Sequence, residues 1–99
     1  MTKIQGLSSD QLKKIVNIIH THLPNVHIFA FGSRITGTPR KYSDFDIALD
    51  NGHPIDLSKL TKIKNTLSET DLPITVDLVD YSSVSSEFKT IIDKQKLEL

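Results

Sequence analysis

The run from Asp44 to Asp50 constrains this chain more than any other segment, because its side chains alternate between polar and apolar with a period of two. Successive residues of a β-strand point to opposite faces of the sheet. The pattern predicts a strand that buries one face in a hydrophobic core and carries carboxylates on the other. The apolar face comprises Phe45, Ile47 and Leu49, and the opposite face comprises Asp44, Asp46, Ala48 and Asp50.

Helical patterns lie on both sides of this strand. Ser8 and Gln11 have the spacing of a capping box, and apolar residues then recur at steps of three and four until Pro24. A second helix with the same period is predicted over about residues 56–68. Serines within residues 82–86 can cap a last helix. Its predicted apolar face comprises Phe88, Ile91, Ile92 and Leu97.

Two further strands complete the predicted sheet. Residues 26–31 are rich in β-branched and aromatic side chains, and residues 74–80 are mostly apolar after a turn. Residues 33–43 predict a loop, or one short helical turn followed by a loop. The order is helix, strand, loop, strand, helix, strand, helix. It predicts an α/β (α+β) fold, in which helices pack on a small mixed β-sheet.

The length of the chain, 99 residues, fits one domain that spans residues 1–99. Hydrophobic residues make up 37% and charged residues 24%, values that argue against disorder, a collagen repeat or a coiled coil. No internal repeat or linker interrupts the pattern. We therefore expect one folded unit.

Charge and cysteine content narrow the function further. Twelve basic and twelve acidic residues balance, so any affinity for an anion must be built locally. The absence of cysteine excludes disulfides and thiolate metal sites. No long apolar run is present, and the lysines at 59, 62 and 64 do not form a patch with interleaved aromatics. These features predict a cytoplasmic protein without direct contact to membrane or nucleic acid.

Three aspartates are candidate metal ligands. The i, i+2 spacing of Asp44 and Asp46 places both carboxylates on one face of one strand. Asp77 lies within an otherwise apolar strand, where a buried carboxylate would be costly unless it were paired or bound to metal. Three carboxylates from two strands suit Mg²⁺. The alternative is that Asp44 begins the strand and Asp46 faces solvent, as Asp50 and Asp80 are expected to do at strand ends.

A candidate phosphate site precedes these carboxylates. Gly32 permits close approach of the backbone to a ligand, Ser33 offers a hydroxyl, and Arg34 adds positive charge. The segment lacks the spacing of a P-loop or a dinucleotide fingerprint, and a Gly-Ser pair is also common in ordinary turns. The position of the Gly32-Ser33 pair is informative, because ten residues separate it from Asp44-Phe45-Asp46 and both segments can face one cleft.

Gly-Ser, ten residues, Asp-x-Asp and a later strand aspartate resemble the nucleotidyltransferase superfamily that includes DNA polymerase β, and specifically its minimal nucleotidyltransferases. The resemblance covers about residues 26–80. It implies that Gly32 and Ser33 hold the β- and γ-phosphates of ATP. It also implies that Asp44, Asp46 and Asp77 form a triad that binds two Mg²⁺ ions. Arg34 would help to bind the triphosphate, and Arg40 and Lys41 are weaker candidates for the same role. Thr36 stands where many members have arginine.

The same resemblance implies an adenylyltransferase. Minimal nucleotidyltransferases are commonly paired with an all-α HEPN-type partner, and several such pairs are toxin and antitoxin. The expected reaction moves AMP from ATP to a tyrosine hydroxyl of that partner, in a hetero-oligomer or homo-oligomer. One alternative is a nucleotide-binding antitoxin that is catalytically weak or inactive and acts by contact alone. Another is a small-molecule nucleotidyltransferase completed by dimerisation.

Other polar and aromatic residues are expected to have structural roles. The four histidines do not have the spacing of a zinc site. Two tyrosines flank the candidate cleft in sequence and can either stack on a base or pack at a strand end. These residues are His20, His22, His27, His53, Tyr42 and Tyr81.

Overall fold

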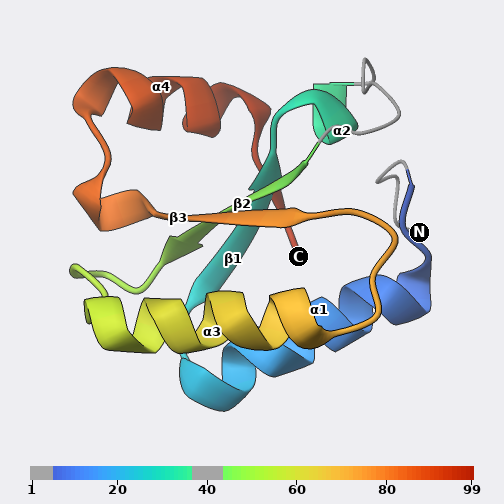
Figure 1. Cartoon of the computed structure of the whole chain (residues 1–99). Helices are drawn as coiled ribbons and strands as arrows, with labels where there is room; N and C mark the ends of the chain where they lie inside the picture. The colour runs from blue at the N-terminus through green and yellow to red at the C-terminus, as the bar shows by residue number, and fades with distance from the viewer. Residues whose placement is uncertain (1–5, 37–43) are drawn as a thin grey trace.

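The computed structural model describes residues 6–36 and 44–99. Helices and strands alternate along the chain, and Figure 1 shows a central sheet with helices on both faces. The arginine, lysine and tyrosine at positions 40–42 lie outside the described residues. The elements are α1 (Ser9–His22), β1 (His27–Phe31), α2 (Ser33–Thr36), β2 (Phe45–Asp50), α3 (Leu57–Glu69), β3 (Val76–Asp80), a 3₁₀ turn η1 (Tyr81–Ser83), α4 (Ser86–Gln95) and β4 (Leu97–Glu98).

The long helices begin where the sequence supplies a side-chain cap. The Ser8 hydroxyl accepts a hydrogen bond from the Gln11 amide, and the Gln11 side chain accepts one from the Ser8 amide, which completes the predicted capping box. Asp56 caps α3, and Ser85 caps α4. The predicted helix over about residues 56–68 is confirmed as α3. Each cap satisfies backbone donors that a helix start leaves without partners.

The strands form one mixed sheet in the order β3-β2-β1-β4. Strands β1 and β2 are antiparallel, β2 and β3 are parallel, and β4 is antiparallel to β1. The parallel pair is joined through α3, as a parallel connection requires a crossover. The predicted α/β (α+β) class with a small mixed sheet is therefore confirmed.

The two faces of the sheet bury different side chains. The alternating apolar residues of β2 that the sequence predicted for the core are fully buried and pack toward α1 and α3. On the opposite face, Phe31 and Ala48 pack with Ile92 of α4. Figure 1 shows α1 and α3 on one side of the sheet and α4 on the other. The Asp46 side chain, which alternates with Phe45 and Ile47, lies on the α4 face.

The last part of the chain differs from its prediction. Leu97 lies in β4 and not on a helix, because residues 97–98 pair with Phe29 and Ala30 of β1. Ile91 is 49% exposed, although the sequence placed it on the apolar face of the last helix. Only Ile92 of that predicted set is fully buried. Leu97, which the helical pattern assigned to the last helix, instead pairs with the edge of β1.

Across residues 6–36 and 44–99, no helix is both long enough and apolar enough to cross a membrane.

Candidate functional site

The site is built around the glycine that links β1 to α2. Gly32 has a φ of +85°, a conformation that disfavours any residue with a Cβ. Its carbonyl accepts a hydrogen bond from the Ile35 amide, at 3.0 Å, so the chain turns at once into α2. Its own amide donates to Oε1 of Gln95 in α4, at 2.9 Å. The sequence predicted the glycine but not Gln95, which lies 63 residues away and belongs to no local motif.

Gly32 lies directly against the carboxylate of Asp46. A Cβ added at position 32 would overlap Oδ2 of Asp46 and come within 3.1 Å of its Cγ. The turn can therefore approach the acidic strand this closely only because residue 32 lacks a side chain. The candidate phosphate segment and the candidate metal-binding strand meet at one place, as their spacing predicted.

Asp46 and Asp77 occupy paired positions on neighbouring strands. The parallel register of β2 and β3 sets Asp46 beside Asp77, and the antiparallel register of β1 and β2 sets Asp46 opposite Phe31. Adjacent strands lie about 4.8 Å apart, and paired residues point to the same face. Asp44 precedes β2 by one residue. Asp46 and Asp77 therefore lie side by side on one face of the sheet, and Asp44 is close to them in sequence.

The electrostatics of Asp46 reflect this arrangement. Asp46 is half-buried, and partial burial together with the negative charges of Asp77 and Asp44 raises the pKa of its carboxyl. Burial disfavours the charged form, and neighbouring carboxylates repel it. A cation or a bound proton at this position would relieve that repulsion.

Asp77 corrects one expectation from the sequence. It is exposed and not buried, and it lies on β3, the edge strand of the sheet. Asp44 is exposed as well. The argument that a buried Asp77 must be paired or metal-bound was therefore wrong, although its place beside Asp46 remains informative.

The donor set fits Mg²⁺ only as an open site. Among residues 6–36 and 44–99, no three His, Asp or Glu side chains are gathered closely enough to form a ready-made metal centre. Mg²⁺ prefers hard oxygen ligands, and is commonly held by one or two carboxylates together with substrate phosphates and water. Carboxylates that repel one another, next to a backbone turn open to a ligand, have the chemistry for such shared coordination.

Arg34 is almost fully buried, with 5% of its surface exposed. Its guanidinium lies against Gly6, where a Cβ would overlap Nη1 and lie 3.3 Å from Cζ. Ser33, the first residue of α2, is half-buried. The short helical turn that the sequence allowed for this segment is confirmed as α2.

Asp80 corrects a second expectation. The sequence placed it in solvent, but its side chain is buried and acts as a hub of three hydrogen bonds. It accepts from the Ile55 amide at 2.8 Å, from the Ser82 amide at 3.2 Å and from the Ser83 hydroxyl at 2.9 Å. The signal was present in Asp80-Tyr-Ser-Ser, since an aspartate two residues before a serine can cap a turn. Asp80 is therefore a structural residue.

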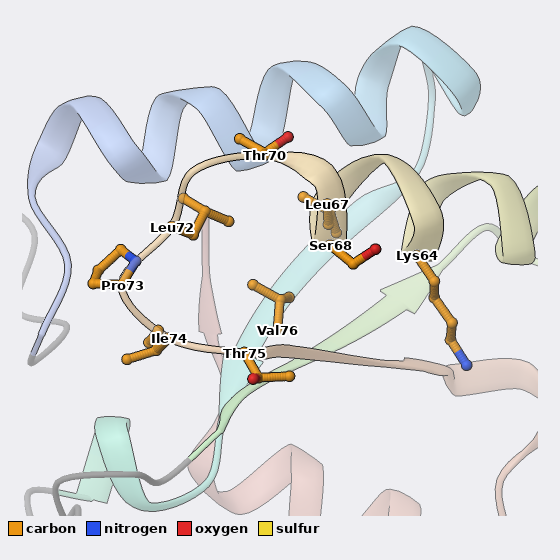
Figure 2. A pocket seen from close by; sticks show the side chains of 9 residues that line it. All are labelled: Lys64, Leu67, Ser68, Thr70, Leu72, Pro73, Ile74, Thr75 and Val76. Atoms are coloured by element: carbon orange, nitrogen blue, oxygen red, sulfur yellow. The ribbon is translucent and has the colours of Figure 1, made fainter.

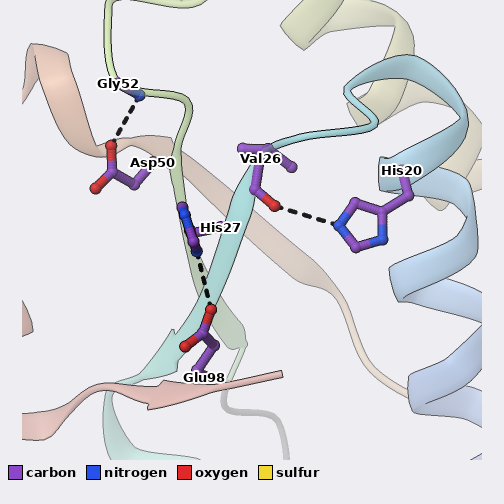
Figure 3. A network of polar contacts seen from close by, with 6 residues as sticks. All are labelled: His20, Val26, His27, Asp50, Gly52 and Glu98. Atoms are coloured by element: carbon purple, nitrogen blue, oxygen red, sulfur yellow. Dashed lines mark hydrogen bonds and ion pairs between the residues drawn. The ribbon is translucent and has the colours of Figure 1, made fainter.

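Figure 3 shows polar contacts of Asp50, His20 and His27. Asp50 accepts a hydrogen bond from the Gly52 amide at 3.0 Å. Nε2 of His20 lies 3.2 Å from the Val26 carbonyl, and Nδ1 of His27 lies 3.0 Å from a Glu98 carboxylate oxygen. Nδ1 of His22 and Nδ1 of His53 each lie within 3.0 Å of the carbonyl oxygens of Ile18 and Pro54, respectively.

Tyr81 packs at the end of β3. Its hydroxyl donates to the carboxylate of Asp93 at 2.9 Å, and this hydrogen bond raises the pKa of the phenol. Lys89 lies 5.6 Å from the centre of its ring. These contacts support the packing interpretation of this tyrosine.

A cavity of about 360 Å³ lies elsewhere, between the end of α3 and the start of β3 (Figure 2). None of the predicted site residues lines it. Its walls are Lys64, Leu67, Ser68, Thr70, Leu72, Pro73, Ile74, Thr75 and Val76.

Comparison with known sequences identifies the family to which the chain belongs. Residues 13–99 match the polymerase β nucleotidyltransferase family model. A probable protein adenylyltransferase, MntA of Haemophilus influenzae, is 38% identical over 88 residues, which make up 89% of this chain and 77% of that protein.

Solved structures with the same fold come from toxin–antitoxin complexes. A chain in a toxin–antitoxin complex with AMP-PNP matches with a TM-score of 0.72 and 28% identity, over 87% of this chain and 69% of that one. A chain in a complex of tri-AMPylated Shewanella oneidensis HEPN toxin with MNT antitoxin matches with a TM-score of 0.64 and 26% identity, over 87% of this chain and 66% of that one.

Proposed function

Because this chain belongs to the polymerase β nucleotidyltransferase family, we propose that it transfers AMP from ATP to a hydroxyl group of a partner protein and thereby acts as an antitoxin. The observation that carries the proposal is the meeting of Gly32 with Asp46, and of Asp46 with Asp77, at one section of the sheet. A phosphate-accepting turn beside paired carboxylates is what transfer of a nucleotidyl group requires.

The triphosphate is proposed to bind at the turn after β1. Gly32 leaves room for phosphate oxygens close to the backbone, and Ser33 supplies a hydroxyl. Arg34 supports this segment from its buried position and adds positive potential beneath it. A chain without net charge thereby has a local means of binding an anion.

Asp44, Asp46 and Asp77 are proposed to hold Mg²⁺ together with the phosphates. When bound, two Mg²⁺ ions would stabilise the charge on the attacking and leaving oxygens of an in-line displacement. Asp46, whose pKa is raised by burial and by its two neighbours, is the carboxylate that gains most from a cation. The chain itself contributes the paired strands β2 and β3, which hold the carboxylate oxygens in fixed positions.

The chemical step exchanges the phosphoanhydride linkage between the α- and β-phosphates of ATP for a phosphodiester linkage to the acceptor. The acceptor hydroxyl oxygen forms a bond to the α-phosphorus of ATP, and the bond from that phosphorus to the bridging oxygen breaks, which releases pyrophosphate. The hydroxyl proton passes to Asp77, which acts as general base. Asp77 suits this role because its side chain is exposed at the sheet edge, where a group carried by another protein can reach it.

The proposed partner is an all-α HEPN-type toxin, and the proposed acceptor is a tyrosine. The similarity to a probable protein adenylyltransferase supports the reaction. The similarity to a chain from a complex that contains a tri-AMPylated HEPN toxin supports the partner. A phenol also suits the exposed carboxylate, since it presents its oxygen at the end of a rigid side chain.

The test is to incubate this protein with the product of the neighbouring gene as the candidate partner, ATP and Mg²⁺, and to weigh the partner by intact mass spectrometry. We expect the partner to gain one or more AMP groups, and peptide fragmentation to place them on tyrosine. The variant Asp44→Asn/Asp46→Asn should give no gain. Asp50→Asn is the matched control, since it removes a carboxylate from the other end of the same strand.

Two outcomes would contradict the proposal. Neutralisation of the partner that persists in Asp44→Asn/Asp46→Asn, with no mass gain in either protein, would assign the function to binding alone. AMP on a small molecule and never on the partner would assign a different acceptor.

A further inference from the structure

The turn of the proposed nucleotide site is bound by Gln95, a residue that belongs to none of the sequence motifs described above. Gly32 makes three contacts that fix its position: its carbonyl accepts from the Ile35 amide, its Cα lies against Asp46, and its amide donates to Oε1 of Gln95. The first two involve the turn and the acidic strand themselves. The third comes from α4, which lies on the face of the sheet that carries Asp46.

Gln95 is itself well anchored. It is the last residue of α4 and is half-buried. The next residues turn back along β1, where Leu97 pairs with Ala30 and the Leu99 amide donates to the Ile28 carbonyl at 2.9 Å. The end of α4 is thus fastened to the same strand whose last residue precedes Gly32, as Figure 1 shows.

The bond also fixes the orientation of the Gly32 peptide. A residue at φ +85° with a free amide could relax toward other conformations, and glycine has more of them than any other residue. Because the Gly32 amide is occupied, the turn keeps the orientation that brings it against the Asp46 carboxylate. The side chain that occupies it is neutral, so it adds no further negative charge beside the three aspartates.

We propose that Gln95 is a positioning residue of the nucleotide site, which holds the Gly32 amide so that the phosphate-binding turn keeps its place against Asp46. The inference rests on the proposed function of that site. Gln95 contacts the site through its hydrogen bond with the Gly32 amide. Its effect is carried through the backbone of Gly32.

The test compares Gln95→Met with Gln11→Met in the full chain. Both variants replace a glutamine whose Oε1 accepts a backbone amide, but the Gln11 bond lies at the start of α1 in the capping box. We expect Gln95→Met to speed hydrogen exchange of the Gly32 amide at least about tenfold. We expect its KM for ATP in the adenylylation assay to rise about fivefold, the order of one lost hydrogen bond, while kcat changes less than about twofold. Gln11→Met should leave both unchanged.

The two measurements separate the failure of this proposal from that of the proposed function. Hydrogen exchange needs neither acceptor nor turnover, so an equally protected Gly32 amide in Gln95→Met would overturn the positioning role whatever the reaction. An unchanged KM for ATP with a lower kcat would also overturn the positioning role. That result would mean that Gln95→Met only reduces the fraction of folded, active enzyme and leaves the ATP site of the folded enzyme intact. Absence of AMP transfer by the unmodified chain would instead overturn the proposed function.

Discussion

Some residues of this protein suit the proposed reaction but destabilise the fold, and the aspartates of the acidic face are the clearest example. Asp46 and Asp77 lie side by side on neighbouring strands, with Asp44 close by, and their mutual repulsion is part of what raises the pKa of Asp46. In the metal-free protein this arrangement lowers the free energy of unfolding. The residues that the proposed reaction needs are therefore ones that folding alone would not select.

The stability cost predicts a pH dependence. Because the folded-state pKa of Asp46 is raised, the folded protein holds its proton more tightly than the unfolded chain, and stability falls as pH rises from about 4 through the raised pKa. Asp77→Asn should raise the free energy of unfolding at pH 7 by less than about 1 kcal/mol, since water screens exposed charges. Urea denaturation in EDTA would measure the gain, which should vanish near pH 3.

Asp71→Asn serves as the control for that experiment, because it removes an exposed carboxylate from the turn before β3. A gain as large in Asp71→Asn as in Asp77→Asn would mean that general charge, and not the pair with Asp46, sets the effect.

Gly32 supports a second prediction at this scale. Gly32→Ala forces a side chain into a positive φ and into the Asp46 carboxylate, so it should lower the free energy of unfolding by roughly 3 kcal/mol. ATP affinity, measured by calorimetry at a temperature where the variant stays folded, should fall at least about tenfold. Gly52→Ala has a similar φ of +80° but no atom within 4 Å of its new Cβ. It should cost only about 1 kcal/mol and leave ATP affinity unchanged.

Side-chain hydrogen bonds join elements of this fold, in addition to the pairing of strands in the sheet. Asp80 ends β3, caps η1 and accepts the amide of Ile55 just before α3 begins. One carboxylate therefore links three elements. Asp50, at the end of the neighbouring strand, accepts only the amide of Gly52 among the hydrogen bonds described above.

Replacement of each aspartate by alanine should separate these roles. Asp80→Ala leaves the buried Ile55 amide without its acceptor and should lower the free energy of unfolding by about 2–3 kcal/mol. Asp50→Ala should cost less than about 1 kcal/mol. Chemical denaturation of both variants would measure the difference, and equal losses would refute the assignment of Asp80 as a hub.

The limits of prediction from sequence also lie at the level of elements. The capping box at Ser8 and the alternation of β2 are local patterns, so helix and strand could be predicted from a few neighbouring residues. Strand β4 has two residues, too few for any period, and exists because the edge of β1 is open to it. Asp50 and Asp80 both end strands, and although Asp80-Tyr-Ser-Ser carries a local capping signal, the burial of Asp80 depends on what packs around it. The bond from Gly32 to Gln95 joins segments that no local pattern relates.

The molecule as a whole places Asp46 and Asp77 on one face of the sheet and its larger core on the other. The fold class could be predicted because a strand with one acidic and one apolar face requires this division. The place of Asp77 on the edge strand could not, since it depends on the order of strands. The order of strands is a property of the assembled sheet and not of any segment.

Metal binding should therefore register in the stability of the whole protein. A ligand that binds only the folded state raises the free energy of unfolding, by about 1.4 kcal/mol at ten times its dissociation constant. We expect Mg²⁺ with a non-hydrolysable ATP analogue to raise the melting temperature of the unmodified chain but not of Asp44→Asn/Asp46→Asn. An equal shift in both proteins would show that the carboxylates do not hold the ion.

The position of β3 at the edge of the sheet has one more consequence, which concerns solubility. An edge strand offers free backbone groups to the same strand of another molecule, and natural sheets oppose this pairing with charge. Asp77, which is exposed at the second position of β3, supplies such a charge. The carboxylate proposed to accept a proton during transfer would thus also discourage chains from stacking edge to edge, and apolar replacements at this position would favour aggregation as well as abolish activity.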